Sequence, residues 1–259
     1  MEHIAYSIIN PAGNITALVT SPVMLEKQKA VAMAILDKEP TCEQVGFVSE
    51  GKDGSHINMR RAGGEFCGNA TMSAAILYCE RTGIESGEIL VKVSGVSDLV
   101  PVTVCKNGDY YECEIKMPKP LSLKEELFQF ENHNYRYPVV SFSGIDHVII
   151  EDDMPIYMAE TAIKIWCDKL KTKGIGFMLY EKEYESLRPL VYVKEPETMC
   201  FESSCASGTA ALITYLSKNL TVDTEKTIKE PGGNITAISR NGEIFLKEIV
   251  DAAIIDKTI

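Results

Sequence analysis

The sequence predicts an α+β protein made of two similar halves, each a mostly antiparallel sheet around a central helix. The chain has 259 residues, enough for one large domain or two of ordinary size. Its 45% hydrophobic and 24% charged residues are typical of a globular protein with a normal core. Sequence features of the first half also recur, in the same order, in the second. We therefore expect an internal duplication, with residues 1–118 as the first half and 119–259 as the second.

The first half begins with a strand, a turn and a second strand over residues 4–20, with the turn at residues 10–14. Ser21 and Pro22 have the residue types of an N-cap and a first helical position, so a helix is predicted from there to about Asp37. The other predicted elements are a strand at 44–48, a hairpin-type turn at 52–55, a segment at 57–61 that leads into a cysteine loop, a helix at 69–81, a strand at 89–93, and two strands that flank the turn at 106–109.

A connector is predicted from about residue 118 to 137, because Pro118, Pro120, an acidic stretch and Asn132 to Asn134 follow one another there. Beyond it the first order returns at offsets of 130 to 138 residues. The matching pairs are residues 13–19 with 144–150, Pro22 with Pro155, residues 45–48 with 175–178, Cys67 with Cys205, residues 94–95 with 231–232, and residues 107–109 with 241–243.

Two of the eight cysteines, Cys67 and Cys205, stand in similar contexts. Each follows an acidic residue and precedes small and polar residues, a Thr four positions on, and an apolar run with helical periodicity. This pattern is typical of a cysteine at a helix N-terminus, where the pKa of a thiol is lowered and its reactivity raised. The alternative is that both are structural cysteines, which a duplication would also copy.

Composition excludes several classes of function. The formal net charge of −11 argues against nucleic acid and anionic membrane surfaces as partners. No basic signal sequence or membrane-length apolar run is present, so a cytoplasmic protein is expected. The cysteines form no C-x-x-C pair, and the four histidines make no zinc-type spacing with them, so no metal site is expected.

Two cysteines on facing loops of a duplicated chain would suit a racemase, since ligand sites are common between domains. One thiolate removes a proton from a carbon, and one thiol returns a proton to the opposite face. Backbone N–H groups at residues 68–70 and 206–208 would hold the substrate carboxylate, where negative charge develops. This chemistry requires no metal and no organic cofactor. The other interpretation is that these segments are plain turns, and that Asn14, Gln44 and His147 are turn, cap or surface residues.

The cysteine motifs resemble those of the diaminopimelate epimerase superfamily of cofactor-independent racemases. They are Cys67-Gly68-Asn69 and Cys205-Ala206-Ser207-Gly208, the second with Ala where the family has Gly. Residues 13–14, 43–44 and 231–233 match as well, so the resemblance spans the chain. It implies the twofold diaminopimelate epimerase-like fold, catalytic roles for both cysteines and no pyridoxal phosphate. The substrate-binding candidates are Asn14, Gln44, Gly68, Asn69, Ser207 and Gly208 from the resemblance, and the acidic Glu202 before the second cysteine.

The positions at which diaminopimelate epimerases recognise the distal end of their substrate differ here. The Gly-Asn-Pro-His segment of those enzymes reads Gly144-Ile145-Asp146-His147 here, so Ile145 replaces its asparagine; Gly174 replaces a second asparagine, and the Glu-Arg pair has no clear match. Longer strings, at residues 10–14, 42–47, 65–73, 91–95 and 97–100, are similar to the histidine racemases of opine-metallophore biosynthesis. The resemblance therefore implies interconversion of L- and D-histidine by a two-base thiol/thiolate mechanism.

Two alternatives remain open at this stage. The first is another racemase or epimerase of the superfamily, acting on diaminopimelate, lanthionine or a further amino acid. The second, from a different class, is a non-catalytic amino-acid-binding or thiol-redox protein. In each case the expected partner is a small molecule. The oligomeric state is left open, with a homodimer as one option.

Overall fold

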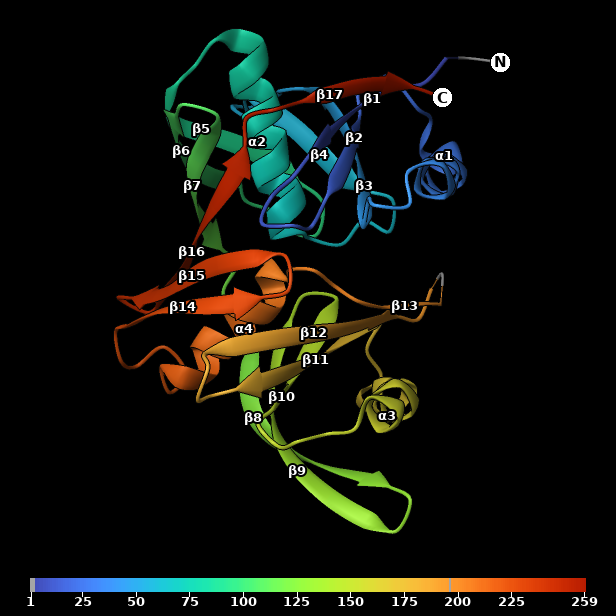
Figure 1. Cartoon of the computed structure of the whole chain (residues 1–259), viewed down its shortest axis with the longest axis vertical. Coiled ribbons are helices and arrows are strands. Elements are labelled where there is room, and N and C mark those ends of the chain that lie inside the picture. Colours follow the sequence, from blue (N-terminus) through green and yellow to red (C-terminus); the bar gives the residue numbers. More distant parts are fainter. Residues whose placement is uncertain (1–2, 196) are drawn as a thin grey trace. The chain divides into compact units, whose positions relative to one another are not determined.

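The computed structural model describes residues 3–195 and 197–259, and the chain divides into two compact units (Figure 1). The first unit runs up to Lys116 and includes Leu246–Ile259, and the second is Met117–Phe245. Sequence analysis placed the whole of 119–259 in the second half, whereas the structure groups the last fourteen or so residues with the first unit because their final strand pairs with the first strand. In the described part of the chain, no helix is both long and apolar enough to span a membrane.

The first unit is a mostly antiparallel sheet with two helices. Its strands are hydrogen-bonded in the order β17–β1–β2–β3–β4–β5–β6–β7, and only β2–β3 and β4–β5 are parallel. The elements are β1 (Ala5–Ile9), β2 (Thr16–Val19), α1 (Leu25–Lys38), β3 (Gln44–Glu50), β4 (Ile57–Arg61), α2 (Gly68–Thr82), β5 (Ser86–Val93), β6 (Val100–Asn107), β7 (Tyr110–Met117) and β17 (Ile255–Thr258).

The second unit repeats this topology. Strand β9 pairs antiparallel with β10, β10 and β11 are parallel partners on either side of α3, and β12 pairs antiparallel with β11. The elements are β8 (Ser122–Phe130), β9 (His133–Phe142), β10 (Ile145–Ile150), α3 (Ile156–Leu170), β11 (Gly174–Glu181), β12 (Ser186–Val193), β13 (Thr198–Phe201), α4 (Ala206–Leu216), β14 (Thr224–Glu230), β15 (Gly233–Arg240) and β16 (Glu243–Asp251), the last continuing into the first unit.

The two units also gain their outer strands in the same manner. Strand β17 pairs antiparallel with β1 in the first unit, and β8 pairs antiparallel with β9 in the second. Along the chain, β8 comes directly after β7, and β17 comes directly after β16. The predicted α+β fold class is confirmed, and the two units share this strand topology.

The helices α2 and α4 are the central helices of their units (Figure 1). Residues 68–77 of α2 are all buried, and in α4 residues 208–214 are buried. Both runs are rich in Gly, Ala, Ser and Thr, whose small side chains let a helix pack closely against strands. Helices α1 and α3 have only one buried stripe each, and the amphipathic pattern of their sequences matches this position at the surface of a sheet.

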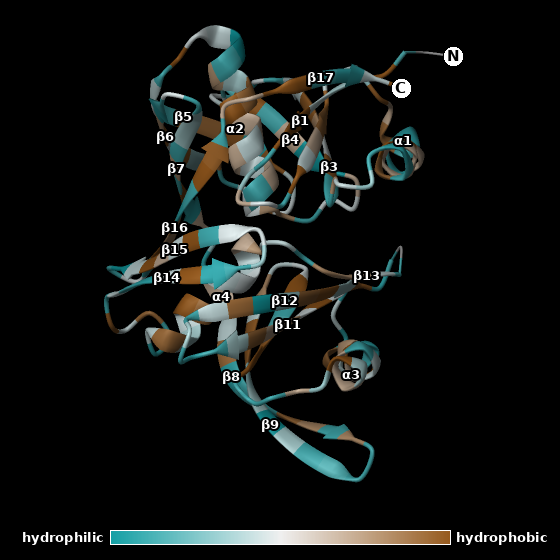
Figure 2. Cartoon of the chain, viewed as in Figure 1, coloured by the Kyte–Doolittle hydropathy of each residue, from teal (hydrophilic) through white to brown (hydrophobic). Residues whose placement is uncertain are grey.

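Two expectations about local structure are wrong. Helix α1 begins at Leu25, not at Ser21, because the Ser21 hydroxyl accepts a hydrogen bond from the backbone N–H of Ala5 and so serves the sheet. The predicted connector at 118–137 is largely the hairpin β8–β9, in which nine residue pairs are in register. Its tip at residues 131–134 is exposed and coloured hydrophilic in Figure 2, which explains why the sequence resembles a linker.

Each sheet presents one face to its outer helix and the other to its central helix. In the first unit Ala17, Val19, Val45 and Phe47 belong to a core cluster with α1, so their neighbours along β2 and β3 point to the α2 side. In the second unit the cluster against α3 contains Val148 and Phe177, among others. Because side chains alternate along a strand, the residues flanking these positions in β10 and β11 face α4.

Candidate active site

Cys67 is the N-cap of α2, as the sequence predicted. Its sulfur accepts a hydrogen bond from the backbone N–H of Ala70 at 3.5 Å. The loop before it is held by Ser94, whose hydroxyl donates to the carbonyl of Glu65 at 2.9 Å. At Gly95, with φ of +88°, a Cβ atom would lie 2.3 Å from the backbone nitrogen of Phe66. A glycine is therefore required there for the loop to approach β5.

Gln44, the first residue of β3, connects the Cys67 thiol to the sheet. The Cys67 sulfur donates a hydrogen bond to Gln44 Oε1 at 2.9 Å, and the guanidinium of Arg61 donates to the same oxygen. Gln44 Nε2 donates to Thr16 Oγ1 at 2.7 Å and to the side-chain oxygen of Asn14. Arg61 also forms an ion pair with Glu65 at 3.3 Å. The thiol thus lies in a network of polar side chains whose geometry the sheet fixes.

Asn14 and Gln44 are both only 4% exposed, so the alternative that they are surface residues is wrong, although Asn14 also closes the turn that begins at Pro11 through its backbone N–H. Asn14 Nδ2 donates to the Glu43 carboxylate at 2.8 Å. Three of the residues predicted from the sequence, Asn14, Gln44 and Cys67, are therefore joined by one hydrogen-bond network.

Gly68 and Asn69 occupy the first turn of α2 and are buried. The backbone carbonyl of Asn69 accepts a hydrogen bond from the Ser73 hydroxyl, and the Thr71 hydroxyl donates to the carbonyl of Cys67 at 2.6 Å. These bonds hold the first turn rigid beside the thiol. The N-terminus of a helix attracts negative charge through its backbone N–H groups, so this turn is able to bind a carboxylate.

In the second unit Cys205 is the N-cap of α4. Its backbone N–H donates to the carboxylate of Glu230 at 2.7 Å, and the hydroxyl of Thr209 donates to the other oxygen of that carboxylate. Thr209 is fully buried and also donates to the carbonyl of Cys205 at 3.0 Å. Glu230 comes directly before the Pro231-Gly232 pair that the repeat singled out, and the N–H of Gly232 donates to the carbonyl of Ser203. The end of β14 therefore holds the cysteine loop in place.

The Cys205 thiol is buried, and its neighbours shift its pKa in opposite directions. Burial, the charge of Glu202, a hydrogen bond to Glu202 and the charge of Glu230 raise its pKa well above the usual value for a thiol, in that order of importance. A hydrogen bond with the Ser207 hydroxyl, 3.6 Å from the sulfur, lowers the pKa to a smaller extent. The sequence predicted a lowered pKa from the helix N-terminus alone; for Cys205 this is wrong, because desolvation and two carboxylates outweigh the helix.

Close packing beneath Cys205 explains why positions 208 and 176 are glycines. A Cβ atom at Gly208 would lie 2.2 Å from the sulfur of Met178 and 3.2 Å from the sulfur of Cys205. One at Gly176 would lie 2.5 Å from Nδ1 of His147. His147 is fully buried, so the alternative of a surface or turn histidine is wrong, and its Nε2 lies 3.0 Å from the Ser207 hydroxyl.

Sequence reasoning missed Thr16, Arg61 and Glu230 as partners of the cysteine loops. Thr16 has its own signal, because it stands at the position of His147 in the repeat. Glu230 could have been found from its place before the Pro-Gly pair. Arg61 gave no signal beyond lying before the first cysteine loop.

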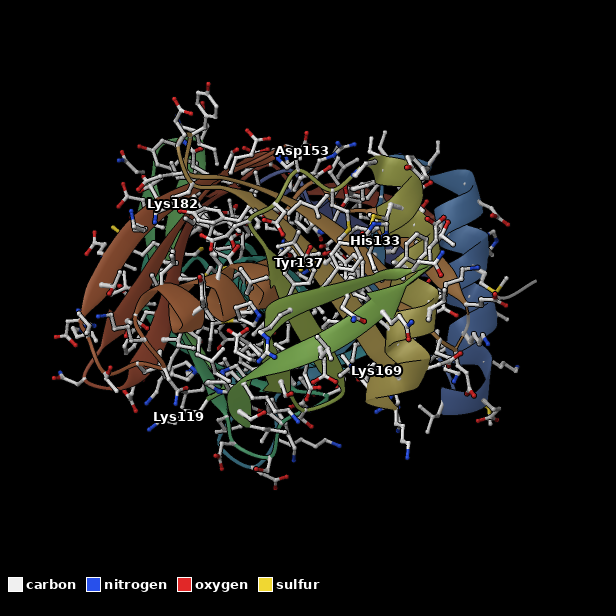
Figure 3. The ribbon with its side chains drawn as sticks, turned by 90° about the horizontal axis from the view of Figure 1, so that it is seen from below. Lys119, His133, Tyr137, Asp153, Lys169 and Lys182 are labelled. Carbon is white, nitrogen blue, oxygen red and sulfur yellow. The ribbon has the colours of Figure 1, made fainter. Side chains whose placement is uncertain are left out.

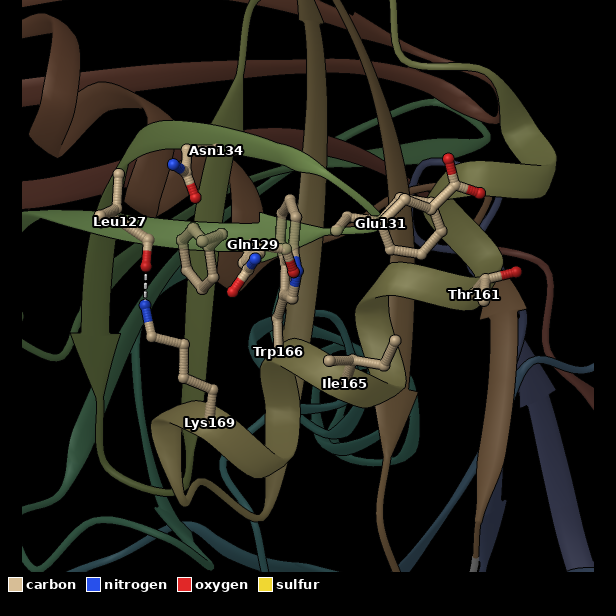
Figure 4. Close-up of a pocket in the computed structure, with 10 residues that line it drawn as sticks. Leu127, Gln129, Glu131, Asn134, Thr161, Ile165, Trp166 and Lys169 are labelled. Atoms are coloured by element: carbon tan, nitrogen blue, oxygen red, sulfur yellow. Dashed lines mark hydrogen bonds between the residues drawn. The ribbon is translucent and has the colours of Figure 1, made fainter.

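Described residues of the second unit line an open pocket of about 710 Å³ between the β8–β9 hairpin and α3 (Figure 4). Trp166 and Phe128 stack at its base with ring centroids 4.3 Å apart, and Lys169 donates to the carbonyl of Leu127. Figure 3 shows the hairpin with His133 beside the helix that carries Lys169. Phe128 and Trp166 belong to the cluster that faces α3, whereas Cys205 begins α4. Within the second unit, this pocket is therefore on the opposite side of the sheet from α4 and Cys205.

A comparison with protein families shows to which family the chain belongs. The family described as the histidine racemase CntK N-terminal domain matches residues 3–252 of this chain. The chain belongs to the histidine racemase family. A histidine racemase of Fusobacterium nucleatum subsp. nucleatum is 35% identical over 253 residues, covering 92% of this chain and 90% of that protein. A histidine racemase of Staphylococcus aureus is 30% identical over 251 residues, covering 92% and 89%.

Solved structures show the same fold at low sequence identity. A predicted epimerase of Pseudomonas aeruginosa aligns with a TM-score of 0.69 at 10% identity, covering 99% of both chains. A hydroxyproline epimerase of Agrobacterium vitis, with bound trans-4-hydroxy-L-proline, aligns with a TM-score of 0.66 at 10% identity over 99% of this chain and 93% of that one. A phenazine biosynthesis protein of Clostridium difficile aligns with a TM-score of 0.62 at 15% identity over 99% of both chains. The predicted fold class is confirmed.

Proposed function

We propose that this protein is an amino-acid racemase that interconverts L- and D-histidine by a two-base mechanism through Cys67 and Cys205. The observation that supports this most is the match of a histidine racemase family over residues 3–252, in a chain whose two repeats each have a cysteine as the N-cap of the central helix. Membership of the family supports histidine as the substrate, and the two cysteines support the two-base mechanism.

In this mechanism one cysteine is a thiolate and takes the proton from the α-carbon, while the other is a thiol and donates a proton to the opposite face. The roles reverse for the other enantiomer. The high pKa of the Cys205 thiol favours its protonated form in the free enzyme. Cys205 is then the proton donor for one enantiomer, and it must lose this proton to act as the base for the other.

Substrate binding follows from the two helix N-termini. The first turns of α2, with Gly68 and Asn69, and of α4, with Ser207 and Gly208, would stabilise the carboxylate as negative charge develops on it. Gln44 and Asn14 hold the Cys67 side of the site, and Glu202 would attract the substrate ammonium group. No step of this mechanism needs a metal or pyridoxal phosphate.

The first test is racemisation of L-histidine by the purified protein with EDTA present and without pyridoxal phosphate. Chiral chromatography should show D-histidine until the enantiomers are equal, and the reaction in deuterium oxide should place deuterium on the α-carbon. If histidine is unchanged while another amino acid in a panel that includes diaminopimelate and lanthionine is racemised, the protein is a different epimerase of the superfamily. Tight binding of histidine without deuterium incorporation would instead indicate a binding protein.

The second test replaces each cysteine separately. Cys67→Ser and Cys205→Ser should each reduce racemisation by about 10³-fold or more, since a serine hydroxyl is a far weaker acid than a thiol and does not ionise near neutral pH to provide a base. Cys105→Ser is the matched control, because Cys105 is exposed on β6. Full activity in either of the first two variants, with the control also active, would refute the two-base assignment.

A further inference from the structure

The two cysteines are supported by different partners, although their helices are equivalent. The Cys67 thiol donates to a side-chain amide oxygen at 2.9 Å, a contact that favours the protonated thiol. Near Cys205 an uncharged polar group, the hydroxyl of Ser207, lies 3.6 Å from the sulfur and either donates or accepts. Which role that hydroxyl takes depends on its other neighbour, His147.

His147 lies on β10, on the face of the sheet that α4 covers. Because Val148 and Phe177 face α3, His147 and its register partner Gly176 lie on the other face. The imidazole is fully buried, with its edge against the ring of Phe142 at 6.1 Å between centroids. Its Nε2 is 3.0 Å from the Ser207 hydroxyl, across 60 residues of sequence.

The surroundings of the ring decide which nitrogen carries the proton. Within the part of the chain that the structure describes, Nδ1 of His147 is buried and has no hydrogen-bond partner. A proton on Nδ1 would be a buried donor without an acceptor, which costs more than an unpaired lone pair. The tautomer with hydrogen on Nε2 satisfies the ring, and burial lowers the pKa of His147 to about 3, so the ring stays neutral.

We propose that His147 is a positioning residue for Cys205: its Nε2–H donates to the Ser207 oxygen, which turns the Ser207 hydrogen toward the Cys205 sulfur. The hydroxyl then stabilises the Cys205 thiolate, whereas a hydroxyl that accepted from the thiol would stabilise the protonated form. This inference rests on the proposed role of Cys205 as an acid and base. Cys205 must become a thiolate in that role, and burial and the carboxylates of Glu202 and Glu230 all oppose the thiolate. The hydrogen bond from Ser207 offsets part of their effect.

Packing supports a fixed ring. A Cβ atom at Gly176 would lie 2.5 Å from Nδ1 and 3.0 Å from Cε1 of His147, so the glycine allows the ring to rest on the backbone of β11. The equivalent position in the first unit is Thr16, which accepts a hydrogen bond from Gln44, the residue that contacts Cys67. The same place in each repeat therefore supports its cysteine through one intermediate side chain.

The test measures the reactivity of Cys205 with iodoacetamide at a fixed, mildly alkaline pH, with peptide mass spectrometry to follow this cysteine and exposed Cys105 as the internal reference. His147→Phe fills the space of the ring but has no donor. It should slow alkylation of Cys205 about tenfold, the equivalent of one pKa unit. Loosened packing would have the opposite effect, because it would expose the buried sulfur and speed the reaction.

Four further variants complete the experiment. Ser207→Ala should slow alkylation to the same extent, and the double variant should be no slower than either alone, since both act through one hydrogen bond. His147→Gln, whose amide can replace the Nε2–H donor, should keep most of the reactivity. His133→Phe, the same change at an exposed position of the hairpin tip, should leave it unchanged.

Nitrogen-15 NMR of the four histidines gives a readout that does not depend on thiol chemistry. The shifts of His147 should be those of a neutral ring with hydrogen on Nε2. A proton on Nδ1, unchanged or faster alkylation in Ser207→Ala, or additive effects in the double variant would each overturn the proposal. None of these results depends on whether the protein racemises histidine, so failure of the proposed function would be seen separately.

Discussion

The sulfur of Cys67 lies 2.9 Å from Oε1 of Gln44, a residue 23 positions earlier that begins a strand beneath the helix. The same oxygen accepts a hydrogen bond from Arg61, and the amide nitrogen binds Thr16. Gln44 therefore orients the thiol and at the same time satisfies a buried cluster of polar groups. Its removal should affect both activity and stability.

Gln44→Leu keeps the volume of the side chain but removes all of these hydrogen bonds. Buried polar partners left unpaired cost about 1–3 kcal/mol, so the free energy of unfolding should fall by that amount. Histidine racemisation should fall about tenfold or more, because the thiol loses its fixed orientation. Denaturant titration and chiral chromatography provide the two measurements. Gln129→Leu, at an exposed position on β8, is the control; a Gln44→Leu protein with unchanged activity would contradict this role.

Glu202→Gln removes a negative charge and an ionic hydrogen bond next to Cys205. Since both raise the pKa of this thiol, the variant should have a lower thiol pKa. Alkylation of Cys205 by iodoacetamide at fixed pH should therefore be faster. Glu160→Gln, on the exposed side of α3, should have no effect. Slower alkylation in Glu202→Gln would show that Glu202 does not set the charge state of the thiol.

Glu248 on β16 is fully buried, and among the described residues neither of its carboxylate oxygens has a hydrogen-bond partner. Burial raises its pKa to about 8, so the folded protein holds a proton that the unfolded chain releases near pH 4.5. The folded state binds more protons between these values, and stability attributable to this group is therefore lost as pH rises from about 4.5 to about 8, by up to ~1.4 kcal/mol per pH unit.

Glu248→Gln should abolish this loss. Urea unfolding at several values between pH 5 and pH 8 should give a stability difference between variant and wild type that grows with pH. Burial of neutral His147 has the opposite slope below its usual pKa, but it is the same in both proteins and cancels in the difference. Glu114→Gln, at a residue paired with Lys247, is the control. Parallel curves for Glu248→Gln and wild type would contradict the prediction.

Gly176→Ala tests the packing beneath Cys205. The added Cβ atom would lie 2.5 Å from Nδ1 of His147 and 2.7 Å from Cε of Met178, so the ring must move. Overpacking of this kind typically lowers the free energy of unfolding by about 1–3 kcal/mol. Gly174→Ala, two residues earlier on the same strand, is the matched control, because its Cβ atom would make only ordinary contacts at 3.5 Å and beyond. Equal stability of the two variants, measured by thermal unfolding, would refute the close packing.

Much of the fold could be predicted because local sequence patterns determine its helices and turns. Small and polar residues followed by an apolar run placed both cysteines at helix N-termini. The hairpin at residues 106–109 followed from an Asn-Gly pair, whose backbone preference selects a tight turn. The segment at 118–137 was not predicted as a hairpin, because the pairing of β8 with β9 depends on tertiary context and the polar tip resembles a linker.

The amino-acid sequence by itself determined the repeat, the two cysteines and the family, since each is a matter of residue order along the chain. Only the tertiary structure decided which side chains surround each sulfur. Gln44 reaches Cys67, Glu230 reaches the backbone of Cys205, and His147 reaches Ser207 through strand register, which no local pattern reveals. The direction of the Cys205 pKa was decided in the same way, because burial and neighbouring carboxylates are properties of the folded chain and not of the residues beside the cysteine.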